Sequence, residues 1–287
     1  MKSFIKSLLA QAVSNDAVWA ALDATVLKAT RYAEWSRQTT VMDRVIDVCG
    51  QHIFPDLTIK HGVFEGMKYP TAQSFGSTLF PKLIGCYEKE IQPIIEAICS
   101  NSYDDIVNIG CGEGYYAVGL AMRLPFAKVY AYDTDEKAIQ FCKRLAEVNN
   151  VGGQITTGGF CDTETLSSMS FQKALILSDC EGYEKQLFTE DIVPYLSDHD
   201  LLVEVHDFID IEISSLLRKR FESSHVIEVI QSIDDVKKAQ TYHYDELREY
   251  DLATRKVLLA ERRPTIMEWF YMRSRMYLNI QHDFGSA

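Results

Sequence analysis

A glycine-rich segment near the middle of the chain has the composition of a ligand-binding loop. Val107–Gly114 reads Val-Asn-Ile-Gly-Cys-Gly-Glu-Gly and lies between a short apolar run and a predicted helix. Glycine lets the backbone turn tightly and come close to a ligand. Asp133 ends the next apolar run, where a carboxylate can accept hydrogen bonds from both hydroxyls of a ribose. Together these features predict a cofactor that contains a nucleoside, rather than a glycine-rich turn without a ligand.

The spacing of the glycines separates two classes of cofactor. A dinucleotide-binding loop reads G-x-G-x-x-G, but its last glycine position is Tyr115 here, and the glycines run G-x-G-x-G. Glu113 would also repel a pyrophosphate, whereas S-adenosylmethionine carries a sulfonium and an ammonium group. The loop therefore favours S-adenosylmethionine over NAD, and an NAD-dependent oxidoreductase or epimerase is the alternative.

Polar side chains gather at the ends of two later predicted strands. Asp179 and Glu181 follow Ala174–Ser178, and Glu204, His206 and Asp207 end or follow Leu201–Val205. Because the carboxyl ends of parallel strands open into the ligand crevice, we expect these groups to surround an acceptor. His206, with an ordinary pKa of about 6.5, is the candidate base, oriented by a neighbouring carboxylate. The alternative is a structural histidine bonded to Glu204 or Asp207.

The same groups leave a metal-binding alternative open. Asp179, His206 and Asp207 offer ligand types that bind Mg²⁺ or another divalent ion. The amino-acid types alone do not separate orienting carboxylates from metal ligands. A site without a metal is the favoured prediction.

Alternating strands and helices must position these residues. The predicted strands are Ile106–Gly110, Lys128–Tyr132, Gln154–Thr157, Ala174–Ser178, Leu201–Val205, His225–Ile230 and Lys256–Ala260. The predicted helices include Val18–Trp35, Pro81–Ile98, Tyr115–Arg123 and Asp135–Asn149. Such alternation implies right-handed crossovers and a parallel sheet, to which the last strand could return antiparallel. The predicted fold is an α/β, Rossmann-like, seven-stranded, mostly parallel sheet at 101–287, after an N-terminal, mainly helical cap region at 1–100.

The composition argues against several classes of protein. The chain has 29 Lys and Arg residues against 41 Asp and Glu residues, a net charge of −12, so a nucleic-acid partner is disfavoured. No apolar run reaches the ~20 residues of a membrane span, and Phe4–Val13 has the periodicity of an amphipathic helix. The seven scattered cysteines indicate a reducing compartment such as the cytoplasm. A small-molecule partner is expected, and a homo-oligomer is compatible with the sequence.

The glycine loop and Asp133 resemble the class I S-adenosylmethionine-dependent methyltransferases over about Tyr103–Glu261. Ser178–Glu184 reads Ser-Asp-Cys-Glu-Gly-Tyr-Glu, which is similar to the D-x-E-G-x-E stretch of the FkbM-type family. The resemblance implies O-methylation of a sugar, a glycan precursor or a secondary-metabolite hydroxyl, with S-adenosylhomocysteine as product. A non-catalytic protein that keeps the fold and binds the cofactor is a further alternative.

The same resemblance implies roles for individual residues. Those assigned to the cofactor are Gly110, Cys111 and Gly112 for its methionine part, Asp133 and Thr134 for the ribose, and Cys161 and Asp162 for the adenine. Asp179 would lie where the sulfonium meets the acceptor. Asn108 stands where the family usually has an acidic residue, which removes one charge but keeps a polar group.

Two other regions are candidates for walls around the acceptor. One is Ile233–Arg255, which contains Tyr242-His243-Tyr244, and the other is the N-terminal region with Lys82, Tyr87 and Glu88. For both regions structural packing is the default expectation.

Overall fold

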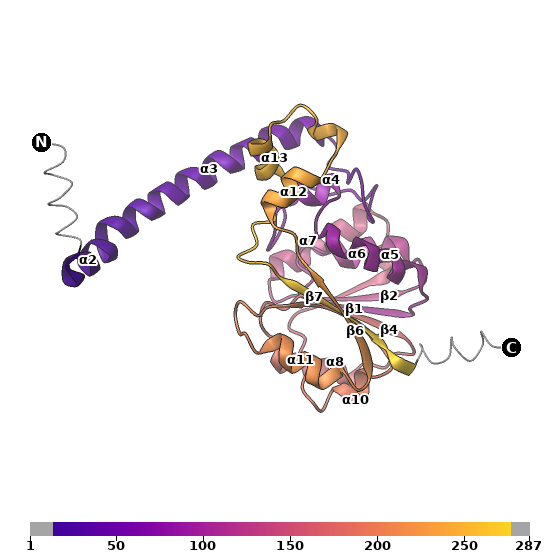
Figure 1. Ribbon diagram of the computed structural model, residues 1–287. Helices are drawn as coiled ribbons and strands as arrows, with labels where there is room; N and C mark the ends of the chain where they lie inside the picture. Colours follow the sequence, from indigo (N-terminus) through magenta and orange to yellow (C-terminus); the bar gives the residue numbers. More distant parts are fainter. Residues whose placement is uncertain (1–13, 277–287) are drawn as a thin grey trace, which may run out of the picture. The chain divides into compact units, whose positions relative to one another are not determined.

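The computed structural model describes residues 14–276 of the 287-residue chain (Figure 1). The amphipathic helix predicted at the start of the chain lies outside the described residues. The chain divides into two compact units, Met1–Ile53 and Phe54–Ala287. Residues 54–100 thus belong to the same unit as the sheet, and a cap role for the region 1–100 stays a prediction.

The first unit is helical in its described part. It contains α2 (Asp16–Leu22), the π-helical segment η1 (Asp23–Leu27) and α3 (Lys28–Ile53). Asn15 begins α2, because its side-chain oxygen accepts hydrogen bonds from the backbone N–H groups of Ala17 and Val18. Asn15 is therefore the N-cap of this helix.

The second unit is built on a seven-stranded sheet with the strand order β3-β2-β1-β4-β5-β7-β6. Its strands are β1 (Asp105–Ile109), β2 (Lys128–Tyr132), β3 (Ile155–Gly158), β4 (Ala174–Ser178), β5 (Asp200–Val205), β6 (His225–Gln231) and β7 (Glu268–Ser274). Strands β1 to β5 pair in parallel, whereas β7 runs antiparallel to both β5 and β6. This arrangement confirms the predicted Rossmann-like, mostly parallel sheet.

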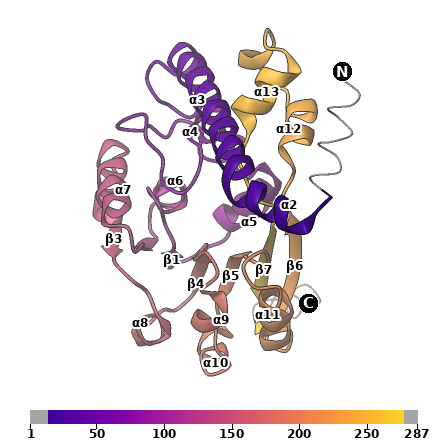
Figure 2. The ribbon, with the colours of Figure 1, turned by 90° about the vertical axis from the view of Figure 1, so that its left-hand side faces the viewer.

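Helices cover both faces of this sheet (Figures 1 and 2). On one face lie α5 (Gln92–Ser100), α6 (Tyr115–Arg123) and α7 (Glu136–Val148), and on the other lie α8 (Thr163–Ser168), α9 (Glu184–Leu187), α10 (Val193–Leu196) and α11 (Ile213–Phe221). Leu166, Leu196 and Phe221 of the second set are buried with Val107 and Val203 of the strands in one apolar core. Burial of these side chains fixes the strand ends in place.

Two predicted elements differ from the structure. Lys256–Ala260 is not a strand but mostly part of α13 (Leu252–Leu259), because Asp251 accepts a hydrogen bond from the N–H of Thr254 and caps a helix there. The antiparallel last strand is β7 instead, whose central residues are buried between β5 and β6. A short apolar run does not by itself distinguish a strand from a helix.

The helix predicted at Pro81–Ile98 is also divided. The chain forms α4 (Leu79–Ile84), the 3₁₀ segment η2 (Lys89–Ile91) and then α5, with Pro93 in the first turn of α5. Gly85 ends α4 with a φ of 86°, and a side chain there would collide with the backbone of His61.

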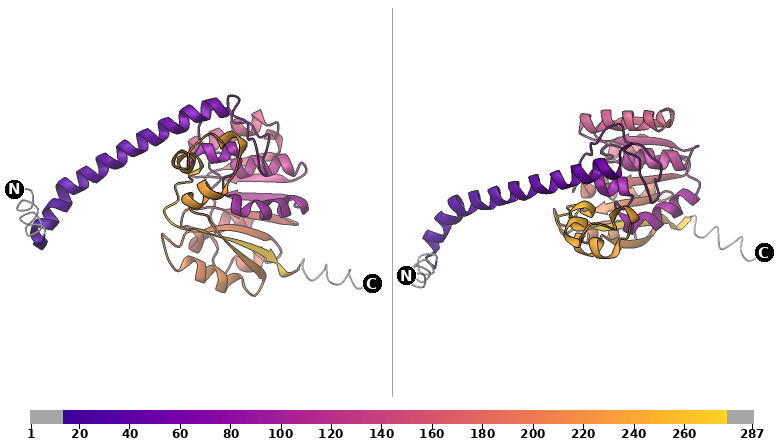
Figure 3. Two further views of the ribbon diagram at one scale, coloured as in Figure 1. Left: turned by 45° about the horizontal axis from the view of Figure 1, so that its top comes forward. Right: turned by 90° about the horizontal axis from the view of Figure 1, so that it is seen from above.

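Two short helices and two 3₁₀ segments complete the described part of the second unit. α12 (Asp235–Thr241) contacts α13, and α13 contacts α4; α12 and α13 are the light orange helices in Figure 3. The 3₁₀ segments η3 (Gly152–Gln154) and η4 (Asp245–Leu247) lie before β3 and before α13. Between 51 and 80 only one antiparallel bridge forms among the described residues, from Thr58 to Lys68. None of the described helices is long and apolar enough to cross a membrane.

Candidate active site

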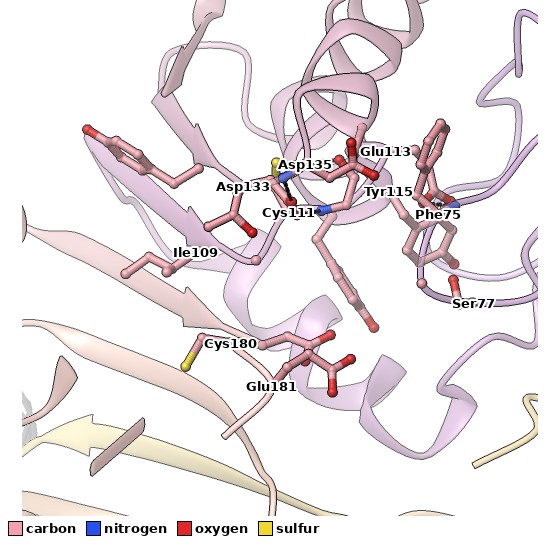
Figure 4. A pocket seen from close by; sticks show the side chains of 18 of the residues that line it. Phe75, Ser77, Ile109, Cys111, Glu113, Tyr115, Asp133, Asp135, Cys180 and Glu181 are labelled. Carbon is pink, nitrogen blue, oxygen red and sulfur yellow. Dashed lines mark hydrogen bonds between the residues drawn. The ribbon is translucent and has the colours of Figure 1, made fainter. Parts of the chain in front are cut away.

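A cavity of about 360 Å³ lies at the carboxyl ends of the parallel strands (Figure 4). The ends are level, because Ile109 of β1 is in register with Tyr132 of β2 and with Ser178 of β4. The residues that follow β1, β2, β3 and β4 all contribute lining side chains or backbone. The volume is within the range of small-molecule sites.

Gly110 closes the bottom of this cavity. Its N–H and that of Cys111 both donate to the carbonyl oxygen of Tyr132, at 2.9 Å, so the loop crosses the end of β2. The φ of Gly110 is 75°, and a Cβ at this position would collide with the carbonyl oxygen of Asp179. Only glycine lets the loops after β1 and β4 meet here.

The third glycine of the loop has a different role. Gly114, with a φ of 94°, precedes α6, and a Cβ there would press against the sulfur of Cys142 on α7. The last glycine of the G-x-G-x-G pattern therefore serves the packing of α6 against α7. Tyr115, which replaces the last glycine of a dinucleotide loop, is buried and contacts Phe64 edge-on.

Asp133 lines the cavity, and backbone N–H groups orient its carboxylate (Figure 4). Its Oδ2 accepts a hydrogen bond from the N–H of Gly112 at 2.7 Å, and its Oδ1 accepts one from Asp135 at 2.8 Å. Each carboxylate oxygen keeps a second lone pair for a ligand hydroxyl. Thr134 and Asp135 also line the cavity, and Asp135 caps α7.

Glu113 does not present an unpaired charge to a ligand, which corrects one step of the sequence argument. It is 1% exposed, forms an ion pair with Lys82, and accepts hydrogen bonds from the Ser74 hydroxyl and the Phe75 N–H, at 2.8 and 3.0 Å. Burial opposes the charged form of Glu113, but Lys82 and these hydrogen bonds outweigh it and lower its pKa. Because Lys82 neutralises its charge, Glu113 would not repel a pyrophosphate. This carboxylate therefore does not distinguish S-adenosylmethionine from NAD.

The contacts of Glu113 also attach a segment that the sequence did not single out. Phe75, Gly76 and Ser77 line the cavity opposite the strand ends, and Phe75 and Ser77 are visible in Figure 4. A polar loop between two apolar segments gives no local sequence signal for this placement. Lys82, which was predicted as a wall residue, lines the same side.

The remaining predicted cofactor residues have different environments. Cys161 lines the cavity after β3, whereas the carboxylate of Asp162 accepts a hydrogen bond from Thr165 and caps α8. Asp162 is not among the lining residues. Asn108 is 1% exposed on β1, does not line the cavity, and its amide atoms have no hydrogen-bond partner among the described residues.

A second, smaller cavity of about 110 Å³ shares a wall with the first. The residues that line both are Gly76, Ser77, Tyr87, Asp179 and Glu181. The smaller cavity is otherwise lined by residues after β5 and by a segment before β7, including Arg263 and Met267. A ligand in the first cavity would therefore meet a ligand in the second at Asp179 and Glu181.

His206 lies in this second cavity and is held by a residue that the sequence analysis did not assign. Its Nδ1 is 2.5 Å from Oε1 of Glu184, which is fully buried at the start of α9. Its Nε2 lies 3.4 Å from Asp179 and 3.5 Å from Glu181. The predicted partner Glu204 is farther away, at 3.9 Å. Glu184 is the last acidic residue of the D-x-E-G-x-E stretch, so the motif did contain the signal.

The electrostatics of this centre favour positive charge. Burial opposes the imidazolium form of His206, but the hydrogen bond and charge of Glu184, with Glu204 and Glu181, outweigh it and raise the pKa of His206. Burial, with the charges of Glu204 and other carboxylates, raises the pKa of Asp179 well above its ordinary value. One oxygen of Asp179 is buried without a hydrogen-bond partner among the described residues.

Asp207 does not belong to this centre, in contrast to its predicted catalytic role. Its Oδ1 accepts a hydrogen bond from the N–H of Ser214 at 2.8 Å, in the first turn of α11. It lines neither cavity. Asp207 lies in the turn that follows β5, where the N–H of Ile209 donates a hydrogen bond to the carbonyl oxygen of His206.

A buried ionic network forms the far wall of the smaller cavity. Arg263 forms ion pairs with Glu88, Glu204 and Glu261, and Glu261 also pairs with the buried Lys238. The predicted wall residue Glu88 is thus part of the network rather than of the cavity surface. Burial raises the pKa of Glu88, and the charge of Arg263 offsets only part of this rise, so the resulting pKa is about 8.

The region 233–255 does not line either cavity of the site. His243 and Tyr244 border a separate hollow together with His61 and Glu246. The wall opposite the strand ends is formed instead by the segment that contains Arg263 and Pro264.

Part of the second unit is similar to a known protein family. Residues 92–175 match the family model "Methyltransferase small domain". No curated protein matches the chain.

Solved structures give more remote likenesses. Precorrin-6y C5,15-methyltransferase from Geobacter metallireducens is 12% identical, over 63% of this chain and 86% of that one, with a TM-score of 0.43. TrmN from Thermus thermophilus is 14% identical, over 64% and 47%, with a TM-score of 0.42. A putative O-methyltransferase from Klebsiella pneumoniae is 12% identical, over 81% and 90%, with a TM-score of 0.41.

The strand order and the family match agree with each other. A mostly parallel sheet with an antiparallel strand between its fifth and sixth strands is the class I methyltransferase fold, and the match covers the glycine loop, β1 to β3 and the start of β4. These findings support the predicted methyltransferase domain and S-adenosylmethionine as its cofactor.

Proposed function

We propose that this protein is a methyltransferase of the FkbM type that transfers a methyl group from S-adenosylmethionine to a hydroxyl of a small molecule, such as a sugar or a secondary metabolite. The observation that carries the proposal is the wall shared by the two cavities. Asp179 and Glu181 border both of them, and His206 lies directly behind on the acceptor side. The cofactor cavity thus opens onto a group that can take a proton.

The residues of the larger cavity suit the cofactor. Asp133 would hold the ribose, and the backbone around Gly110 and Cys111 would lie against the methionine part. When bound, S-adenosylmethionine supplies a methyl group on a sulfonium cation. Methyl transfer is an in-line displacement, so the protein contributes mainly position and a place for the hydroxyl proton.

His206 is the proposed base. Glu184 holds Nδ1, which leaves the lone pair of Nε2 on the side of Asp179 and Glu181. Nε2 would take the proton of the acceptor hydroxyl, and the Glu184 carboxylate would stabilise the resulting imidazolium. The seven free cysteines suit a reducing compartment such as the cytoplasm.

Binding of the cofactor tests the proposal first. Calorimetry should show that S-adenosylmethionine and S-adenosylhomocysteine bind, and Asp133→Ala should weaken both about 10- to 100-fold, because charge-assisted hydrogen bonds are lost. Asp162→Ser is the control, since serine keeps the cap of α8 and the residue lies outside the cavity; its affinities should equal those of the wild type. Stabilisation by NAD but by neither methyl compound would overturn the proposal.

A further inference from the structure

Asp179, Glu181 and His206 point their ligand atoms at a common space. One atom from each, Oδ1, Oε2 and Nε2, lies within 4.8 Å of the others. The separations of 3.4 and 3.5 Å from Nε2 are too long for good hydrogen bonds. Two adjacent ligands bound at about 2.1 Å to one octahedral ion lie about 3.0 Å apart, so small side-chain movements would bring these atoms to a cation. The spacing is therefore close to that of ligands around one ion.

The orientation of His206 provides a second, independent observation. The imidazole is 2% exposed, and Nδ1 is 2.5 Å from a carboxylate oxygen of Glu184, so Nδ1 carries the proton that is donated there. Nε2 makes no hydrogen bond within the described part of the chain and is directed at two carboxylates. Two carboxylates facing Nε2 favour positive charge on or beside this atom, which either a proton or a bound cation can supply. A buried glutamate behind a histidine is the usual support of a metal-binding imidazole.

The charges around this space are not balanced. Arg263 and Lys238 are already paired with Glu88, Glu204 and Glu261. In the described part of the chain, Asp179, Glu181 and Glu184 each form an ion pair with His206. Three carboxylates thus face one imidazole, which leaves an excess of negative charge around it.

We propose that Asp179, Glu181 and His206 bind one divalent cation of the Mg²⁺ or Mn²⁺ class. Two carboxylates and an imidazole suit such an ion, and they leave coordination positions for water or an acceptor hydroxyl. The side chain of Glu181 is 71% exposed and that of Asp179 is 29% exposed, so the ion can enter from solvent. Both residues border the cofactor cavity and the acceptor cavity.

The catalytic consequence rests on the proposed function, whereas the cation site does not. With a cation bound, Nε2 of His206 is a ligand and no longer the base. A hydroxyl that coordinates the same cation has a lowered pKa and loses its proton to solvent. In the cation-loaded protein, solvent would therefore accept the hydroxyl proton in place of His206.

Titration with Mn²⁺ alone tests the site in the full chain. Chelator-treated protein, without S-adenosylmethionine, should bind one Mn²⁺, seen both by calorimetry and by loss of the free-ion electron paramagnetic resonance signal. Glu181→Gln and Asp179→Asn should each weaken Mn²⁺ at least tenfold. Glu212→Gln is the matched control, because Glu212 is equally exposed, at 73%, and loses the same charge. It should bind Mn²⁺ like the wild type.

The outcomes separate this proposal from the proposed function. Failure to bind Mn²⁺ at millimolar concentration, or equal loss in Glu212→Gln and Glu181→Gln, overturns the cation site. Binding of S-adenosylmethionine without Mn²⁺ binding leaves the methyltransferase intact and removes only the cation. Mn²⁺ binding without cofactor binding supports the cation site and contradicts the methyltransferase.

Discussion

The two sides of the site use their acidic residues in opposite ways. On the cofactor side, Glu113 is paired with Lys82 and accepts hydrogen bonds from Ser74 and Phe75. On the acceptor side, Asp179 and Glu181 lie 3.4 and 3.5 Å from Nε2 of His206, too far for good hydrogen bonds. A buried carboxylate that is paired with a cation joins two segments of the structure. A cluster of carboxylates with excess negative charge instead indicates a binding site. The difference separates structural from functional carboxylates within one cavity.

The largest expected effect is on the balanced side. Glu113→Gln should lower the free energy of unfolding by about 3–5 kcal/mol, because it leaves the buried ammonium of Lys82 without a counter-charge. Glu181→Gln should change it by less than about 0.5 kcal/mol, since Glu181 is exposed and without such a partner. Urea denaturation of both variants measures the difference.

A double variant sharpens the same comparison. Lys82→Met with Glu113→Gln removes both charges and should recover much of the lost stability, since buried pairs can often be replaced at little cost. Equal destabilisation by Glu113→Gln and Glu181→Gln would contradict the division into a structural carboxylate, Glu113, and a functional one, Glu181.

The pH dependence of stability provides the next test. The folded-state pKa of Glu113 is lower than its ordinary value of 4.5, so its contribution is complete above pH 4.5 and is lost as the pH falls through the folded-state value. The stability difference between wild type and Glu113→Gln should therefore be constant near neutral pH and shrink below pH 4.5. Thermal unfolding from pH 7 to 3.5 would show this, and a difference that grows with acidity would contradict the ion pair.

The sequence predicted the parts of the fold and site that depend on local pattern. The strands β1, β2 and β4 are short apolar runs. The glycine loop comes directly after β1 in the chain, and Asp133 comes directly after β2. The antiparallel strand β7 was misplaced because the apolar run in 256–260 and the real strand look alike until the partner strands are known. Register and pairing of distant segments are tertiary properties.

The partners of the site residues were the least predictable part. A neighbouring carboxylate was expected to orient His206, with Glu204 or Asp207 as the partner in the structural alternative, but the residue that holds it is Glu184 at the start of α9. Lys82 likewise reaches Glu113 across 31 positions of the chain. Residue types and spacing indicate that a carboxylate will orient a histidine, and only packing decides which one.

The smallest expected effect concerns Asp207, the carboxylate that sequence proximity placed in the acceptor cluster. Its Oδ1 accepts a hydrogen bond from Ser214 in the first turn of α11, so Asp207→Ala should cost about 1 kcal/mol of stability. Asp207→Asn should cost almost nothing, because the side-chain oxygen of asparagine can accept the same hydrogen bond from Ser214. Both variants should bind Mn²⁺ and S-adenosylmethionine like the wild type. If Asp207→Asn instead lost Mn²⁺ tenfold without losing stability, Asp207 would be a ligand, and the division between structural and functional carboxylates would have to be redrawn to include it.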